Sequence, residues 1–451
     1  MTRSLSTPLI GLTGLGRDPC PEGLDRYLTT KTPFGEQTMF AGVSVLPRAA
    51  TAVFTRDRGL RVRQRDTDVS RGGPEDLASA GARLQNLLRT EVHRLAVAAD
   101  VPISTITSGG LDSSLVTALL AEEVPQVHAF NIAYTGHWPF DEKRYAREVA
   151  QMSGARYHQI EADPEAFPAL LDDVVWHLGQ PNADPITLST YLLFQGVHDA
   201  GFKVTLSGDA ADEIFGGYGR IRTAIEAGPD WHRDYVDALA AVPSYLRQQL
   251  YSDDYRDLLR TEGTESDRIT ERLRAGGADR LGAITDFEVD ERLPAYHLRR
   301  VDHLSMAHSV EVRLPFCQPS VVRAARALPD DLRVGGGEVK RALYAAARRL
   351  VPSSVLDRPK QPFTLPITSM LVEGTALHTY ARDLLAPDRL ARDGRLDPVA
   401  VSGLLDAHTA RPDDRSALAI WSLLVHQVWT EQITAHRDDV LVASGGRRTA
   451  A

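Results

Sequence analysis

The chain has 451 residues, of which 43% are apolar and 25% charged, so it can bury a core sufficient for two or three domains. Its formal charge of −9 argues against a protein that binds nucleic acid or a membrane mainly through charge. The only cysteines, Cys20 and Cys317, lie far apart, which excludes a disulfide framework and a cysteine-based zinc site. With no signal-peptide pattern and no apolar run long enough to span a bilayer, we predict a cytoplasmic protein.

The first part of the chain alternates short strand-like segments with Gly and Pro. We expect strands over Thr38–Leu46, Ala50–Thr55 and Gly59–Gln64. The polar, Gly-containing segment Asp66–Pro74 is predicted to be a linker.

From Glu75 onward, helical and strand patterns follow one another. Leu84, Leu88 and Val92 lie on one face of an amphipathic helix. Strands are then predicted at 102–107, 127–134, 157–161 and 204–206, and helices at 113–122, 143–153, 165–178 and 188–200. This alternation predicts an α/β fold with a doubly wound parallel sheet, in which ligands bind at the carboxyl ends of the strands. Beyond about residue 221 the pattern is mostly helical and ends with a helix over 417–433.

A Gly-rich loop, Ser108–Ser114, follows the first of these strands and opens a helix. Its two glycines allow close backbone approach to an anion, and the helix start offers free N–H groups. Asp112 would repel a bare phosphate, so it favours a divalent cation that in turn binds phosphates. The alternative is an ordinary turn in which Asp112 caps the helix.

A second loop, Leu206–Tyr218, follows the strand at 204–206 and should reach the same edge of the sheet. It carries three acids, Asp209, Asp212 and Glu213, between glycines. Such a cluster is typical of a metal or acid–base site. The alternative is an acidic helix N-terminus that complements the helix dipole.

Four segments together resemble one family. Ser108–Ser114 resembles the pyrophosphate loop of N-type ATP pyrophosphatases, and Leu206–Tyr218 resembles the second signature of the asparagine synthetase and β-lactam synthetase family. Further on, Arg300–Phe316 is similar to the substrate-side segment of that family, and Lys340–Phe363 to its lysine-bearing segment. Four motifs in the family's order make the resemblance specific.

The resemblance implies an adenine-nucleotide alpha-hydrolase type of fold, which we place over residues 76–440, with a helical C-terminal part. It also implies the chemistry. A carboxylate attacks the α-phosphate of ATP to give an acyl-adenylate and magnesium pyrophosphate, and an amine then displaces AMP. The expected cofactors are therefore ATP and Mg²⁺.

The resemblance also implies roles for individual residues. Asp112 and Asp212 would hold magnesium, and Lys360 would face the negative charge that develops on phosphate. The pyrophosphate would be held by the loop residues Ser108, Gly109, Gly110 and Ser113, and the adenosine by Thr107, Ile132, Ser207 and Gly208.

Two departures from the family pattern change the functional prediction. Residue 2 is Thr2 where amidotransferase members have a nucleophilic cysteine, so we interpret residues 1–70 as a truncated, β-rich glutaminase-like remnant. Cys20 is a poor substitute nucleophile because no base is adjacent in the sequence. The second departure is Asp209, which stands where asparagine synthetases commonly have Glu and β-lactam synthetases Tyr; it is the candidate general base, although its reach is shorter.

The sequence thus predicts an AMP-forming amide ligase in specialised biosynthesis, such as that of an antibiotic, which joins a small carboxylate to ammonia or a small amine without glutaminase activity. An intramolecular ligase that closes a β-lactam or macrolactam is the main alternative. A catalytically inactive nucleotide-binding module and a sulfur- or tRNA-modifying enzyme are weaker ones. We expect no nucleic-acid or membrane partner, and leave open a homodimer and a separate glutaminase or carrier protein.

Overall fold

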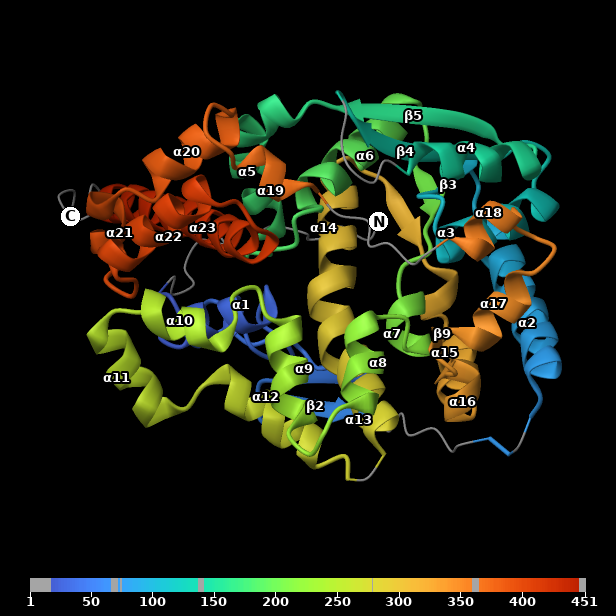
Figure 1. Ribbon diagram of the computed structural model, residues 1–451, viewed down its shortest axis with the longest axis horizontal. Helices are drawn as coiled ribbons and strands as arrows, with labels where there is room; N and C mark the ends of the chain where they lie inside the picture. Colours follow the sequence, from blue (N-terminus) through green and yellow to red (C-terminus); the bar gives the residue numbers. More distant parts are fainter. Residues whose placement is uncertain are drawn as a thin grey trace.

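The computed structural model describes residues 18–65, 72–73, 75–136, 142–277, 279–358 and 365–445. Figure 1 shows a β-sheet with its covering helices on the upper right and the C-terminal helices on the upper left. Below them lies a third group of helices, and the helix α14 (Arg299–Met306) stands between the groups.

Five parallel strands form the central sheet in the order β5-β4-β3-β6-β7. Their bounds are β3 (Ile103–Ile106), β4 (His128–Tyr134), β5 (Arg156–Ala162), β6 (Val204–Leu206) and β7 (Glu311–Arg313). After β3, the strands β4 and β5 are added in turn on one side of it, and β6 then pairs with the other side of β3. The strand order therefore reverses between β3 and β6, which is the position where open parallel sheets bind ligands.

Separate apolar clusters cover the two faces of the sheet, as expected for a doubly wound fold. On one face, Ile103 and Val204 pack in a cluster with residues of α2 (Leu77–Val97) and α3 (Leu111–Glu123). On the other, Phe130 packs with residues of α5 (Phe167–Leu178) and α6 (Thr187–Asp199). The predicted fold class is confirmed.

The other helices on the sheet side are α4 (Lys143–Met152), α15 (Pro319–Arg326), α16 (Asp330–Arg333), α17 (Arg341–Ala347) and α18 (Ser353–Asp357). The short strands β8 (Val334–Gly335) and β9 (Glu338–Val339) pair with each other in the same region.

Most of the rest of the chain is helical. The second-loop region and lower group contain α7 (Ala211–Phe215), α8 (Gly219–Glu226), α9 (Trp231–Leu239), α10 (Ser244–Leu250), α11 (Asp253–Glu262), α12 (Glu265–Arg274) and α13 (Arg280–Phe287). A π-helix, η3 (Glu288–Leu298), joins α13 to α14. The C-terminal group contains α19 (Ile367–Met370), α20 (Ala376–Leu384), α21 (Pro387–Asp393), α22 (Pro398–Ala410) and α23 (Asp414–Gly445). In the described part of the chain, no helix is both long and apolar enough to cross a membrane.

The N-terminal part differs from the predicted run of strands. The antiparallel hairpin β1 (Ala50–Thr55) and β2 (Gly59–Gln64) has the predicted bounds. However, the strand predicted over Thr38–Leu46 is wrong, because Thr38 donates its hydroxyl to the carbonyls of Phe40 and Val43 and so stabilises a turn. The preceding segment forms an unpredicted helix, α1 (Gly23–Thr30).

Helix α1 is part of the main core. Tyr27 and Leu28 are buried in the same apolar cluster as Trp429 of α23, and the Tyr27 hydroxyl donates to the Ser422 carbonyl at 2.8 Å. The domain bounds of 1–70 and 76–440 stay a prediction, and much of the linker predicted over 66–74 lies outside the described residues.

Candidate active site

The loops that follow β3 and β6 touch each other at the switch point of the sheet. A Cβ atom on Gly208 would lie 2.6 Å from the backbone nitrogen of Ser113, so only glycine permits this approach. The structure therefore brings together the two loops whose proximity the sequence predicted.

The first loop is organised around the hydroxyl of Ser113. This oxygen accepts from the backbone N–H of Ser108 at 3.0 Å and lies 3.3 Å from the Gly110 carbonyl. Gly109 has a positive φ of 76°, and a Cβ there would lie 2.6 Å from the nitrogen of Ala146. Gly110 is the N-cap of α3, so the loop presents the start of a 13-residue helix to the switch point. Such a helix start binds anions through its free N–H groups and dipole.

The acids predicted to hold metal, Asp112 and Asp212, converge on one buried cation. The ammonium of Lys340 lies 2.7 and 2.8 Å from the two oxygens of Asp112 and 2.7 Å from Oδ1 of Asp212. Burial disfavours the charged amine, but the two carboxylates overcome this effect and raise the pKa of Lys340. Lys340 adopts a left-handed backbone conformation with φ of 53°, immediately before α17.

Two converging carboxylates are hard oxygen donors of the kind that magnesium prefers. Among the described residues, no group of three or more metal-ligating side chains occurs. The pair therefore fits a metal ion that takes its other ligands from phosphate and water.

Asp209, the predicted general base, is partly buried beside these groups. One of its oxygens accepts from the hydroxyl of Ser207, and the other lies 3.9 Å from Arg300. Burial raises the pKa of Asp209, and the Ser207 hydrogen bond opposes part of that rise. Arg300 also pairs with the buried Asp184, and burial lowers its pKa to about 10. Arg300 thus brings α14 to the second loop.

The third acid of the loop, Glu213, belongs to a buried ion-pair network behind the site. Its carboxylate lies 3.0 Å from Arg292 and 2.8 Å from His297, and accepts from the hydroxyl of Tyr218. Although burial favours the neutral acid, His297 and then Arg292 lower the pKa of Glu213 to about 2. Arg292 also bonds Glu288 at 3.0 Å, so the network ties the second loop to η3.

The residues predicted to surround adenosine lie at or near the ends of their strands. Thr107 follows β3, and its hydroxyl is buried without a hydrogen-bond partner among the described residues. Ser207 follows β6, and its N–H donates to the Arg313 carbonyl of β7 at 3.1 Å. Ile132 lies inside β4 and packs in the apolar core. Their nucleotide contacts stay predictions, and Lys360 lies outside the described residues.

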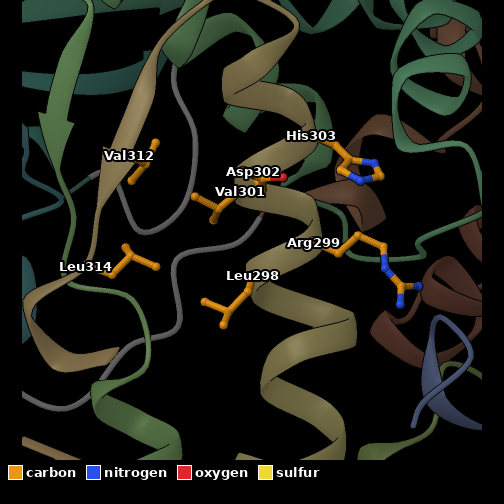
Figure 2. A pocket seen from close by; sticks show the side chains of 7 residues that line it. All are labelled: Leu298, Arg299, Val301, Asp302, His303, Val312 and Leu314. Atoms are coloured by element: carbon orange, nitrogen blue, oxygen red, sulfur yellow. The ribbon is translucent and has the colours of Figure 1, made fainter. Parts of the chain in front are cut away.

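A cavity of about 360 Å³ adjoins α14. Figure 2 shows Leu298 and Val301 pointing from the helix toward Val312 and Leu314, while Arg299 and His303 point to the other side. The carbonyl of Arg313, between Val312 and Leu314, accepts the Ser207 bond described above. The apolar part of the cavity therefore lies close to the second loop.

Cys20 has the environment of a structural thiol. Its sulfur lies 3.0 Å from Glu22 and from Arg26, and burial followed by the Glu22 hydrogen bond raises its pKa. A raised pKa lowers the thiolate fraction on which nucleophilicity depends. The structure does place a carboxylate, that of Glu22, beside the thiol, but the raised pKa still makes Cys20 a poor nucleophile.

The sequence motif that contains Lys340 does not reveal its role, because its partners Asp112 and Asp212 lie far away in the chain. A signal was present: only five lysines occur among 51 basic residues, which makes a lysine inside a motif informative. No comparable feature of the sequence points to the ion pairs that Arg292 and Arg300 form.

Comparisons with known proteins agree with this geometry. The family described as Asparagine synthase matches residues 83–431. The chain is 26% identical to asparagine synthetase [glutamine-hydrolyzing] 1 of Bacillus subtilis, over 73% of this chain and 56% of the relative. It is 28% identical to a putative asparagine synthetase [glutamine-hydrolyzing] of Mycobacterium tuberculosis, over 75% and 56%, and 24% identical to amidase chry2 of Gibberella zeae, over 74% and 58%.

The chain spans little more than half the length of these curated relatives. The match nevertheless covers both loops, Lys340 and the substrate-side segment, in an α/β fold with the expected sheet. On this evidence the chain belongs to the asparagine synthase family.

Proposed function

We propose that this protein is an ATP-dependent, AMP-forming amide ligase that activates a carboxylate as an acyl-adenylate and transfers it to ammonia or a small amine. The observation that carries the proposal is the convergence of Asp112, Asp212 and Lys340 beside the helix start at Gly110. This arrangement combines an anion-binding backbone with a cation and two metal-binding carboxylates at the switch point of the sheet.

Each group has a chemical task in this proposal. The backbone at Ser108–Ser113 binds the pyrophosphate that leaves, and Asp112 and Asp212 hold magnesium, which neutralises charge on the phosphates when it is bound. Lys340 supplies a buried positive charge between the two loops. Lys360 faces the negative charge on phosphate, so Lys360→Ala is expected to abolish turnover and to leave ATP binding largely intact.

Asp209 is the proposed base for the second half-reaction. Burial raises its pKa, and a carboxylate with a raised pKa is a stronger base for removing a proton from an attacking amine. The nearby Arg300 offers a positive charge to the carboxylate of the acid substrate.

We further propose that ammonia or an amine is taken up directly, with no glutamine hydrolysis. The environment of Cys20 supports this part of the proposal, because a raised thiol pKa is unsuited to nucleophilic attack on glutamine. The apolar walls of the cavity beside α14 favour an acid with a larger apolar portion than aspartate, as in specialised biosynthesis.

The test is release of AMP and pyrophosphate from Mg-ATP across a panel of amino acids and dicarboxylic acids. Each acid is incubated with ammonium, with glutamine, or with no added amine. Release that requires ammonium and ignores glutamine is the expected result. Release with no amine, giving a product lighter than its acid by one water, would instead support a lactam-forming cyclase, and ADP formation would contradict the chemistry.

A further inference from the structure

A buried ion pair lies next to the pyrophosphate loop, between Glu142 and Arg358. Nη2 of Arg358 donates to Oε1 of Glu142 at 2.6 Å, and the two side chains are only 9% and 8% exposed. Glu142 immediately precedes α4, whose residue Tyr145 packs against Gly109 of the loop. The pair therefore lies against the outer side of the pyrophosphate loop.

The guanidinium of Arg358 is held in place from two sides. It lies 4.5 Å over the ring of Tyr145, while Glu142 binds one of its nitrogens. A Cβ atom added to Gly110 would lie 3.9 Å from Nη2 of Arg358. Gly110 is the N-cap of α3, so the guanidinium is fixed at the helix start that binds anions.

One nitrogen of this guanidinium, Nη1, is buried and has no hydrogen-bond partner among the described residues. A buried charged donor without an acceptor is costly, so such a group indicates a ligand that supplies the acceptor. Arg358 also lies within electrostatic range of the group formed by Lys340, Asp112 and Asp212, because the same phenol, Tyr344, responds to all of them. Burial raises the pKa of Tyr344, and Lys340 and Arg358 both oppose that rise.

We infer that Arg358 is a further ligand of the pyrophosphate group and that Glu142 is its positioning residue. A guanidinium binds phosphate oxygens through parallel N–H bonds, and here Glu142 leaves Nη1 available for that purpose. Arg358 thus approaches the pyrophosphate from the α4 side, whereas Lys340 lies between the two acids of the opposite loops. The inference rests on the proposed function, because pyrophosphate is the product that this function releases.

The experiment measures the Kd of magnesium pyrophosphate by calorimetry on the full chain and on three variants. Arg358→Met removes the guanidinium. Glu142→Gln keeps the shape of the positioning residue but removes its negative charge. Arg144→Met is the matched control, because Arg144 lies on the same helix, is 77% exposed and forms a surface ion pair with Glu148. We expect Arg358→Met to weaken pyrophosphate binding at least tenfold, Glu142→Gln to weaken it severalfold, and Arg144→Met to change it less than twofold.

Unchanged affinity in Arg358→Met and in Glu142→Gln would overturn the inference while leaving the proposed function intact. An equal loss in Arg144→Met would also overturn it, because affinity would then follow net charge alone. If Arg358→Met does not fold, the comparison of Glu142→Gln with Arg144→Met decides the same question. No pyrophosphate binding by the wild type would contradict both the inference and the proposed function.

Discussion

The ammonium of Lys340 lies 2.7 Å from Oδ1 of Asp112, although 228 residues separate the two in the chain. The same ammonium is equally close to Asp212, so one lysine neutralises an acid from each of the two loops. Lys340 therefore links the two loops through its ion pairs, in addition to supplying a positive charge at the candidate active site.

Removal of Lys340 should lower the free energy of unfolding when no metal is present. Lys340→Met leaves two neighbouring carboxylates without their shared cation, and breaking a buried ion pair destabilises a protein by about 3–5 kcal/mol. We expect urea unfolding in EDTA to show a loss on the order of 3 kcal/mol, partly restored by added Mg²⁺. The exposed Lys203→Met is the matched control. Equal stability of both variants in EDTA would contradict the role of Lys340.

Asp209→Asn tests the general base. A base must be deprotonated, so the second half-reaction of the wild type should slow as pH falls through the raised pKa of Asp209. The variant should lose that pH dependence and slow the step by about 10²–10⁴-fold, while ATP–pyrophosphate exchange changes little. Single-turnover reaction of the preformed acyl-adenylate with amine measures the step. Equal loss in both half-reactions would remove the role.

The network around Glu213 should contribute stability rather than chemistry. The pKa of Glu213 falls from its ordinary 4.5 to about 2 in the folded protein, so its contribution is fully present above pH 4.5 and is lost as pH falls to 2. Glu213→Gln should lower the free energy of unfolding by about 3 kcal/mol at pH 7 and by much less at pH 2. Urea unfolding at both pH values checks this. Arg272→Met, which breaks a surface pair, should cost less than about 0.5 kcal/mol.

Lys31, at the end of α1, has the opposite effect on stability. Burial, followed by the charges of Arg292 and Arg220, lowers its pKa from 10.5 to about 7. The cost to folding is therefore full below pH 7 and disappears as pH rises toward 10.5. Lys31→Met should stabilise the protein by about 4 kcal/mol at pH 7 and by less than about 1 kcal/mol at pH 10. A stability difference that does not shrink with pH in urea unfolding would contradict this prediction.

The parts of the fold that the sequence could predict are those with a strong local pattern. The buried strands β3, β4 and β6 follow apolar runs, and α2 follows a helical period, so their positions were predicted to within a few residues. The edge strand β7 (Glu311–Arg313) was missed although Val310–Leu314 alternates apolar and polar residues, because so short a run within a mostly helical region gives a weak strand signal. The segment Thr38–Leu46 was wrongly predicted as a strand because it contains several apolar residues. In the structure it forms a turn that the Thr38 hydroxyl stabilises.

The same distinction applies to the site. Its two loops could be found because each is a continuous motif after a strand. The partners Lys340 and Arg358 could not be assigned, because their roles depend on contacts with Asp112 and Glu142 more than 200 residues away. Glu213 shows the converse: it stands in the acidic motif, yet the fold turns it toward Arg292.

The contact between α1 and α23 constrains the order in which the chain can fold during its synthesis. Tyr27 donates to the carbonyl of Ser422, 395 residues later, so this contact of α1 can form only when synthesis is nearly finished. At 5–20 residues per second this interval is roughly 20–80 s on the ribosome. A ribosome that stops before α23 therefore releases a chain in which α1 lacks this contact.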